Sequence, residues 1–502
     1  MKIQSIAVAV SVLLAACGGG GGGSSGGGGT TPPPVVTPPV VIGQGSINFA
    51  NASVHDPSVI KVDGDYYVFG SHLAAAKTTD LMNWTLVADG VTASNPLFND
   101  VTQELKDTFT WSQVTGLWAP DVVRLPDGKF YFYYDSCKGD SPLSALGVAV
   151  ADRITGPYVN KQILLKSGMW NQISDDGVNV YDAQVHPNVV DPQTFFDASG
   201  KLWMIYGSYS GGIFILGMDA TTGLPLAGQG YGKHLLGGYH ARIEGAYVLH
   251  NAQTGYYYMF TSFGGLDAAG RYNIRVSRGD APDGPYYDAN GTDMSTVKGN
   301  PNLIFDDTRI APYGQKLIGN HEFALLAGEA SPALGYVSPG HNSAYFDAAT
   351  GKYFIIFHTR FPGRGEQHEL RVHELLFNED GWPVMAPLRY VPTSLSTTPV
   401  VAEVTSAAVA GAYKYINHGK DITATIKASQ SVRLNADGTI SGAVAGTWLH
   451  KGNNYVAITL STGEAFNGVL SRQWSSNANA FLVTFSVQSK DGVSIWGTRS
   501  GD

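Results

Sequence analysis

The 502-residue chain is poor in charge and rich in glycine and aromatic residues: 15% of residues are charged, 11% are aromatic and 62 are glycine. A net charge of −9 argues against a nucleic-acid-binding protein, and the composition excludes a coiled coil and a wholly disordered chain. Frequent glycine and 26 tyrosines favour many short strands joined by tight turns.

Residues 1–16 are predicted to be a signal peptide. Lys2 precedes an apolar run, Ile6–Ala16, that is shorter than the roughly 20 residues a membrane-spanning helix needs. The run ends at Leu14-Ala15-Ala16-Cys17, which resembles a bacterial lipoprotein signal, in which the cysteine is acylated. Cys17 is therefore the predicted lipidation site. An ordinary secretory signal with an incidental cysteine is the alternative.

This reading predicts an exported protein that is lipid-anchored at the bacterial cell surface or outer membrane and touches a membrane only through its anchor. Cys137 then stands alone, so no disulfide is expected. Residues 17–45 are rich first in glycine and serine and then in proline. Such a composition is typical of a flexible coil followed by a stiffer spacer, and it predicts a tether.

One short pattern recurs five times between residues 46 and 395. A turn containing glycine is followed by paired aromatic or apolar residues, with strand-like runs on both sides, which is typical of a β-hairpin. The five turns are Asp63-Gly64, Asp127-Gly128, Ser199-Gly200, Thr254-Gly255 and Thr350-Gly351. With no helical periodicity between them, they predict a five-bladed β-propeller. A sandwich with five unrelated hairpins is the alternative.

A polar residue precedes each of these turns by seven to eleven positions. These residues are Asp56, Asp121, Asp191, Glu244 and the pair His341-Asn342. Because the innermost strands of a propeller begin at one end of its central channel, we expect the five positions to converge. Crowded carboxylates are costly unless they are paired or used, so the pattern predicts a functional site.

Paired carboxyl groups are what glycoside hydrolysis requires. A protonated carboxyl delivers a proton to the leaving oxygen, an ionised one activates water, and a third can raise the pKa of the acid. Trp118 and the segment Tyr206–Gly212 would supply aromatic and polar walls for sugar rings, or else are ordinary core and turn residues.

Six motifs carry a resemblance to a known family. They are His55-Asp56-Pro57-Ser58, Trp118-Ala119-Pro120-Asp121, Val190-Asp191-Pro192, Tyr206–Gly212, Ile243-Glu244-Gly245 and Gly340-His341-Asn342-Ser343. In this order they resemble glycoside hydrolase family 43, and within it the extracellular endo-1,5-α-L-arabinanases, over about residues 47–395. The resemblance implies hydrolysis of internal α-1,5-L-arabinofuranosidic bonds of arabinan with inversion at the anomeric carbon.

By matching motifs, the resemblance implies a role for each carboxylate. Asp56 would be the general base, Glu244 the general acid, and Asp191 the group that modulates the pKa of Glu244 and orients substrate. Inversion requires room for a water, which places the carboxyl groups of Asp56 and Glu244 about 6.5–9.5 Å apart. Asp121 is not one of the catalytic three and is interpreted as structural or as a distal contact.

The expected substrate contacts follow from the same resemblance together with Trp118. They are Asp56, Trp118, Gly139, Asn188, Val189, Val190, Asp191, Ser208, Tyr209 and Ser210. The segment around Gly139 departs from the family's usual pattern. His341 is the expected metal ligand, to one calcium ion whose other ligands are mostly waters. Calcium ordinarily prefers oxygen ligands, and a channel histidine bonded to water is the alternative.

Other functions use the same residues. An exo-arabinanase, an α-L-arabinofuranosidase or a β-xylosidase would need the same three carboxylates, and a non-catalytic surface polysaccharide-binding propeller is the alternative from another class. The expected partner is arabinan of plant cell wall pectin, and a monomer is expected.

Residues 405–502 are predicted to be a separate small antiparallel β-barrel. Their sequence alternates between apolar and polar residues and has hairpin signals at Asp437-Gly438, Thr462-Gly463 and Asp491-Gly492. The barrel would pack against the propeller or bind sugar, the latter through a strip formed by Trp448, Tyr455 and Trp474. The whole chain is thus expected to be all-β.

Overall fold

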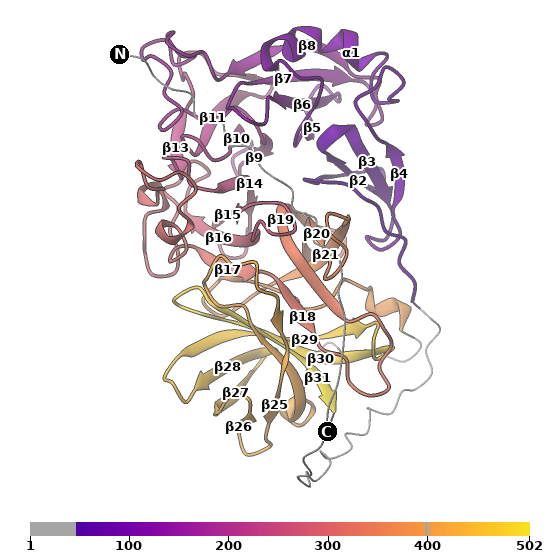
Figure 1. Cartoon of the computed structure of the whole chain (residues 1–502). Coiled ribbons are helices and arrows are strands. Elements are labelled where there is room, and N and C mark those ends of the chain that lie inside the picture. The colour runs from indigo at the N-terminus through magenta and orange to yellow at the C-terminus, as the bar shows by residue number, and fades with distance from the viewer. Residues whose placement is uncertain (1–46, 397–399, 402, 502) are drawn as a thin grey trace, which may run out of the picture. The chain divides into compact units, whose positions relative to one another are not determined.

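The computed structural model describes residues 47–396, 400–401 and 403–501 (Figure 1). The predicted signal peptide, Cys17 and the tether of residues 17–45 lie outside the described residues. Five sheets and a closed eight-stranded barrel confirm the predicted all-β fold, a five-bladed propeller followed by a barrel. In the described part of the chain, no helix has both the length and the apolar character needed to cross a membrane.

Each propeller blade is an antiparallel sheet built from consecutive strands. Blade 1 contains β1 (Ser58–Val62), β2 (Asp65–Gly70), β3 (Ala74–Thr78) and β4 (Thr85–Ala88). Blade 2 contains β5 (Asp121–Arg124), β6 (Phe130–Cys137), β7 (Ser144–Ala151) and β8 (Val159–Lys166). Blade 3 contains β9 (Gln193–Phe196), β10 (Leu202–Tyr206) and β11 (Ile213–Asp219), and β11 also pairs with β12 (Leu224–Pro225) and β13 (Lys233–Leu236).

The last two blades precede the barrel in the sequence. Blade 4 contains β14 (Ile243–His250), β15 (Tyr257–Phe263), β16 (Asn273–Gly279) and β17 (Gln315–Ile318). Blade 5 contains β19 (Leu334–Asp347), β20 (Lys352–Arg360), β21 (His368–Phe377) and β22 (Pro383–Met385), and β18 (His321–Phe323) pairs with the first part of β19. The helices are short: α1 (Val101–Glu104), α2 (Lys106–Ser112) and α3 (Ser406–Val409), with 3₁₀ turns at Ser71–Leu73, Met294–Thr296, Asp307–Arg309 and Thr393–Leu395.

The five predicted turns all join the first and second strands of a blade. Each of their glycines has a positive φ, which an L side chain rarely adopts. The values are 95° at Gly64, 82° at Gly128, 83° at Gly200, 79° at Gly255 and 68° at Gly351. The predicted hairpins are therefore confirmed, and the glycines serve the turn geometry itself.

Apolar clusters between neighbouring blades hold the propeller together. One cluster joins blades 1 and 2, and others join blades 2 and 3, 3 and 4, and 4 and 5. A fifth cluster packs Val59 and Val68 of blade 1 against Ile356 and Val372 of blade 5, so the ring is closed. Closure leaves few exposed strand edges and fixes the inner ends of the strands around one channel.

The C-terminal strands close into a barrel with its own core. They are β23 (Gly411–Asn417), β25 (Gln430–Leu434), β26 (Thr439–Gly442), β27 (Gly446–Gly452), β28 (Tyr455–Leu460), β29 (Ala465–Ser475), β30 (Ala480–Ser489) and β31 (Ser494–Gly501). Trp448 is buried in the barrel core and Trp474 packs beneath Val391 of the propeller side. The expected aromatic strip is therefore not an exposed sugar-binding surface.

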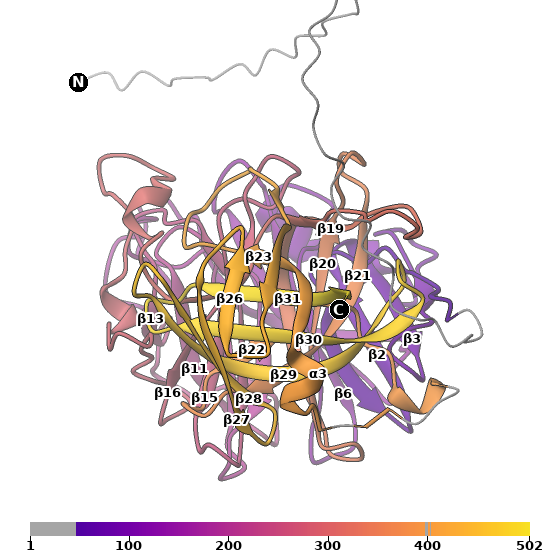
Figure 2. The same cartoon turned by 90° about the horizontal axis from the view of Figure 1, so that it is seen from below.

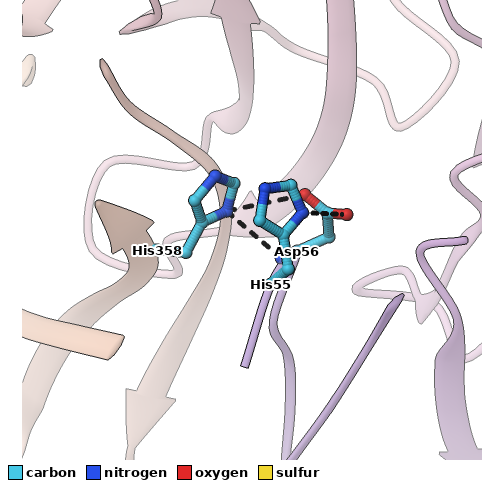
Figure 3. Close-up of side chains that lie close together, drawn as sticks. All are labelled: His55, Asp56 and His358. Atoms are coloured by element: carbon cyan, nitrogen blue, oxygen red, sulfur yellow. Dashed lines mark hydrogen bonds and ion pairs between the residues drawn. The ribbon is translucent and has the colours of Figure 1, made fainter. Parts of the chain in front are cut away.

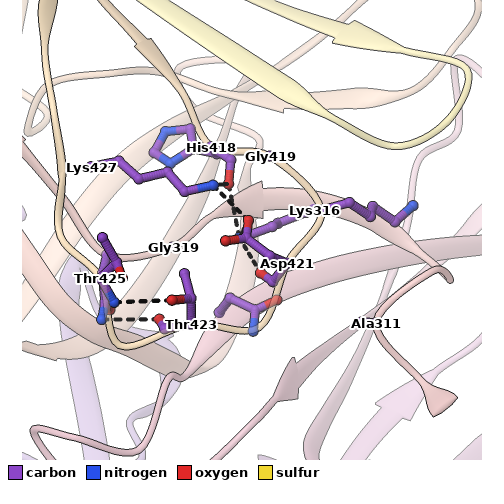
Figure 4. Close-up of polar contacts among 12 residues, drawn as sticks. Ala311, Lys316, Gly319, His418, Gly419, Asp421, Thr423, Thr425 and Lys427 are labelled. Atoms are coloured by element: carbon purple, nitrogen blue, oxygen red, sulfur yellow. Dashed lines mark hydrogen bonds and ion pairs between the residues drawn. The ribbon is translucent and has the colours of Figure 1, made fainter. Parts of the chain in front are cut away.

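The barrel strands lie in front of the blades in the view of Figure 2, and the barrel contacts the propeller through the segment 418–428 (Figure 4). Within this segment, β24 (Lys427–Ala428) pairs in parallel with β18 of blade 5. The buried ammonium group of Lys316 donates to the carbonyl oxygens of His418 at 2.9 Å and Asp421 at 2.7 Å. Ile422 completes the apolar cluster between blades 3 and 4. Polar and apolar contacts thus both tie the barrel to the last two blades.

Candidate active site

The predicted channel residues lie where the innermost strands begin. Asp56 and Asp191 each stand two residues before β1 and β9, Glu244 is the second residue of β14, and His341 lies at a register shift in β19. Asp56, Asp191 and His341 have φ values of 54°, 57° and 43°, the left-handed region that non-glycine residues seldom occupy. Strained backbone of this kind gathers at functional sites because the surrounding fold has to hold it in place.

Asp56 is surrounded by hydrogen-bond donors. Its Oδ2 accepts from His55 Nδ1 at 2.7 Å and from the Ser71 hydroxyl at 2.5 Å, and its Oδ1 lies 3.1 Å from His341 Nδ1. Burial by itself would raise the pKa of Asp56, but His55 and His341 hold it well below its usual range. Asp56 is therefore an ionised carboxylate, the form that a general base requires.

Glu244 is in a different environment. Its Oε2 accepts from the Ser208 hydroxyl at 2.6 Å and its Oε1 accepts from the Tyr272 hydroxyl. Burial raises the pKa of Glu244, and His341 and the two hydroxyl donors only partly oppose that rise. The pKa values of two carboxyl groups in one channel are thus shifted in opposite directions, which is the arrangement of an acid and a base.

Asp191 completes the predicted group of three. Burial, together with the charges of Glu244 and Asp56, raises the pKa of Asp191 to about 8 despite the opposing charge of His341. Burial lowers the pKa of His341, but Asp56 and Asp191 outweigh it and raise that pKa to about 10. Asp56, Asp191, Glu244 and His341 therefore form one electrostatically coupled cluster.

Asp121 is in the channel but not in this cluster. It is the first residue of β5 rather than a residue before the strand. Its Oδ1 accepts from the Ser58 hydroxyl, and its Oδ2 accepts from both the amide and the hydroxyl of Thr194. The carboxylate therefore links blades 1, 2 and 3, as the structural interpretation of this residue predicts.

Most of the residues expected to contact substrate around blade 3 are bonded to other protein groups or have buried side chains. Asn188 Oδ1 accepts from the Ser144 hydroxyl at 2.5 Å, and the side chains of Val189 and Val190 are fully buried. These two valines can thus meet a substrate only through their backbone. The Tyr209 hydroxyl donates to the carbonyl of Gly264 at 3.1 Å, while the carbonyl of buried Ser210 accepts from the amide of His240.

Two other predicted contacts adjoin each other in blade 2. Gly139 has a φ of 88°, and a Cβ there would lie 3.8 Å from the half-buried ring of Trp118. An open hollow of about 650 Å³ is lined by residues 51–53 and 366–369. The ring of His368, in its wall, has its centroid 5.0 Å from that of His55. The hollow therefore lies next to His55, the residue that bonds the Asp56 carboxylate.

Four residues of the cluster were not among the sequence predictions: Ser71, Asp135, Tyr272 and His358. Asp135 lies near the end of β6, is fully buried and accepts from the amide of Asp191 at 3.3 Å. Burial and the charge of Asp191 raise the pKa of Asp135 well above its usual range. An acidic residue at the end of the aromatic run Phe130–Tyr134 was a detectable signal.

One group of three side chains in the described part of the chain has the spacing of a metal site. His55, Asp56 and His358 place their ligand atoms within 4.8 Å of one another (Figure 3). However, His358 Nδ1 accepts a hydrogen bond from the Asp56 amide at 3.2 Å, and His55 Nδ1 is directed at the Asp56 carboxylate. The Nδ1 atoms of both histidines therefore already have partners on Asp56.

Comparison with known proteins agrees with this geometry. Residues 48–308 match the glycosyl hydrolases family 43, and residues 387–497 match the C-terminal lipocalin-like domain of that family. The chain belongs to glycosyl hydrolase family 43. This membership confirms the resemblance predicted from the six motifs and identifies the chain as a glycoside hydrolase.

Relatives within family 43 cover nearly the whole chain. Extracellular endo-α-(1→5)-L-arabinanase 2 of Bacillus subtilis is 56% identical over 90% of this chain and 94% of its own length. The extracellular endo-α-(1→5)-L-arabinanase of Thermotoga petrophila is 47% identical over the same shares. The crystal structure of a family 43 protein from Bacillus licheniformis, 56% identical, superimposes with a TM-score of 0.85 and covers 90% of this chain and 99% of that one.

Proposed function

We propose that this family 43 hydrolase cleaves internal α-1,5-L-arabinofuranosidic bonds of arabinan with inversion. The observation that carries the proposal is the opposite shift of two channel pKa values, that of Asp56 lowered well below its usual range and that of Glu244 raised. The names of the relatives that align over 90% of the chain support arabinan as the substrate.

In the proposed mechanism, Asp56 takes a proton from a water as the water's oxygen forms a bond to the anomeric carbon. The glycosidic bond breaks in the same step, and Glu244 gives its proton to the departing oxygen. Asp191, whose own pKa is raised to about 8 by burial and by the charges of Glu244 and Asp56, would orient substrate and modulate the pKa of Glu244 as a coupled neighbour. Proton exchange with solvent then removes the proton from Asp56 and returns one to Glu244.

Product analysis tests the proposed function. We expect linear, debranched arabinan to yield a ladder of oligosaccharides, because an endo enzyme cuts at internal bonds, and we expect xylan to remain intact. Release of arabinose alone would instead identify an exo-acting enzyme, and release from xylan a β-xylosidase. Binding without cleavage would identify a sugar-capturing propeller and overturn the proposal.

We also propose that His341 ligates one calcium ion. His341 directs Nδ1 at Asp56, which leaves Nε2 as its ligand atom, and metal-binding histidines commonly donate their other nitrogen to a carboxylate. Among the described residues, Asp135 Oδ1 and Asp191 Oδ2 are buried without a hydrogen-bond partner, so hard oxygen donors are close by. The ion would balance the carboxylates of the channel and tune their titration.

Removal of the ion is expected to lower both turnover and Tm. Without a divalent cation, the repulsion among the buried carboxylates is opposed by His341 and, at Asp56, by His55. Dialysis against EDTA followed by arabinan assays and thermal unfolding measures both effects, and added calcium should restore them. Full activity in protein that elemental analysis shows to be free of metal would contradict the calcium proposal.

Replacement of Tyr272 by Phe is expected to move the alkaline limb of the pH profile of kcat/KM to higher pH. The Tyr272 hydroxyl donates to Glu244 and so stabilises the ionised form of that carboxyl. Without this donor the pKa of Glu244 rises further, and the acid keeps its proton at higher pH. Tyr258→Phe is the matched control, since that hydroxyl bonds Thr254 of blade 4 and the carbonyl of Gly381 of blade 5. A downward movement of the limb in Tyr272→Phe would argue against Glu244 as the acid.

Export is supported by the word extracellular in the names of both relatives. We propose in addition that the mature protein begins at an acylated Cys17, is held at the cell surface or outer membrane by that lipid alone, and acts there as a monomer on pectic arabinan. Mass spectrometry of the mature N-terminus tests the anchor, and an unmodified chain would exclude it.

A further inference from the structure

The backbone of the proposed base is held by a residue from another blade. Asp56 has a φ of 54°, a left-handed conformation that is unfavourable for a residue with a side chain. Its amide N–H donates to Nδ1 of His358, which lies on β20 of blade 5, 302 residues away in sequence. This hydrogen bond is available only while the peptide before Asp56 keeps its present orientation.

His358 is suited to accept this bond. Its side chain is fully buried, and burial holds the pKa of His358 well below its ordinary value, so the ring is neutral. A neutral ring that accepts at Nδ1 carries its proton on Nε2. Among the described residues, Nε2 has no hydrogen-bond partner, so the bond to Asp56 is the directed contact of this ring.

A second histidine fixes the plane of the first. The rings of His55 and His358 are stacked with centroids 3.7 Å apart and planes 27° from parallel (Figure 3). His55 in turn donates Nδ1 to the carboxylate of Asp56 at 2.7 Å. The stacked pair therefore holds Asp56 at both ends, the amide through His358 and the carboxylate through His55.

We propose that His358 is a positioning residue for the base of the proposed hydrolysis: by accepting the amide hydrogen of Asp56, its Nδ1 fixes the left-handed backbone that aims the carboxylate at the attacking water. The inference rests on the proposed role of Asp56. It assigns His358 no contact with substrate and no proton transfer. A small displacement of a catalytic group costs about 10²-fold in rate, which sets the size of the expected effect.

Two substitutions at His358 distinguish positioning from packing. Asparagine places its Oδ1 where Nδ1 lies and can accept the Asp56 amide, whereas glutamine places its polar atoms near Nε2 and cannot. We expect His358→Asn to keep kcat within about fivefold of the wild type and His358→Gln to lose about 10²-fold in kcat, with KM changed little in both. A purely structural role predicts the opposite order, because asparagine leaves the larger cavity.

The assay compares kcat and KM on linear arabinan, with Tm and circular dichroism recorded for each variant. If the wild type prefers another glycan, the same comparison on that glycan still decides the role of His358, while the arabinan result decides the proposed function. If His358→Gln does not fold, the rate of His358→Asn decides alone. A folded His358→Asn with a 10²-fold loss, equal rates in the two variants, or failure of both to fold would overturn the proposal.

Discussion

Replacement of Glu244 by Gln is expected to lower kcat on arabinan by about 10²–10⁴-fold, the usual contribution of general acid catalysis, and to leave oligosaccharide affinity nearly unchanged. Glutamine has the shape of glutamate; its amide oxygen can accept from one of the hydroxyls of Ser208 and Tyr272 and its NH2 group can donate to the oxygen of the other, so the channel keeps its packing. It has no acidic proton to give to the leaving oxygen. Initial rates on linear arabinan and calorimetric titration with an arabino-oligosaccharide measure the two effects separately.

A substrate with a good leaving group distinguishes the loss of the acid from the loss of the base. An aryl arabino-oligosaccharide with a nitrophenol leaving group needs little protonation, so it should recover much of the lost rate in Glu244→Gln. Asp56→Asn is the control, because loss of the base slows attack by water on both substrates alike. Hydrolysis of arabinan by Glu244→Gln at the wild-type rate would show that another group is the acid.

The blades were predictable because their signals are local. Each hairpin has its turn glycine and both of its strands within about fifteen residues, and the left-handed turn at Gly64 or Gly128 needs glycine wherever it occurs in a fold. The barrel hairpins at Gly438, Gly463 and Gly492 were found in the same way. By contrast, the parallel pairing of β24 with β18 joins segments about one hundred residues apart and has no turn signal.

The site was predictable only in part, for a related reason. Asp56, Asp191 and Glu244 open inner strands and can be located by counting back from each turn. Tyr272 immediately precedes the third strand of blade 4, and His358 lies on the second strand of blade 5. Their partners are fixed by how blades close around the ring, which no local pattern encodes.

The same counting placed Asp121 with the other acidic residues, although it bonds Ser58 and Thr194 instead. Asp121 begins its strand, whereas Asp56 and Asp191 precede theirs by two residues. Because a strand rises about 3.3 Å per residue, an offset of two positions moves a side chain well along the channel axis. The exact position of each inner-strand residue along the channel is set by how neighbouring blades pack.

The second large effect is expected at the contact between barrel and propeller. Arg275, on β16, is fully buried, and its guanidinium donates to the carbonyls of Ala311, Tyr313 and Lys420 at 2.6–2.7 Å. Burial lowers the pKa of Arg275 to about 9, so the group remains charged at neutral pH. Each buried carbonyl left without its donor costs about 1–3 kcal/mol, and Arg275→Met is therefore expected to lower stability by roughly 3 kcal/mol or more.

For a cooperative unit of this size, with an unfolding entropy of about 2.1 cal/mol/K per residue, such a loss corresponds to a fall in Tm of about 3 °C or more, which scanning calorimetry measures. Arg278→Met on the same strand is the matched control. Arg278 is half-buried, donates to the Asp380 carbonyl and stacks over Tyr256 and Trp382, contacts that a methionine partly keeps, so its expected cost is about 1 kcal/mol. Equal falls in Tm for the two variants would contradict the role assigned to the three carbonyls. A larger fall for Arg275→Met would show that its hydrogen bonds to the propeller and to Lys420 of the barrel contribute to stability, since Arg275, unlike Arg278, donates to Ala311 on one side and to Lys420 on the other.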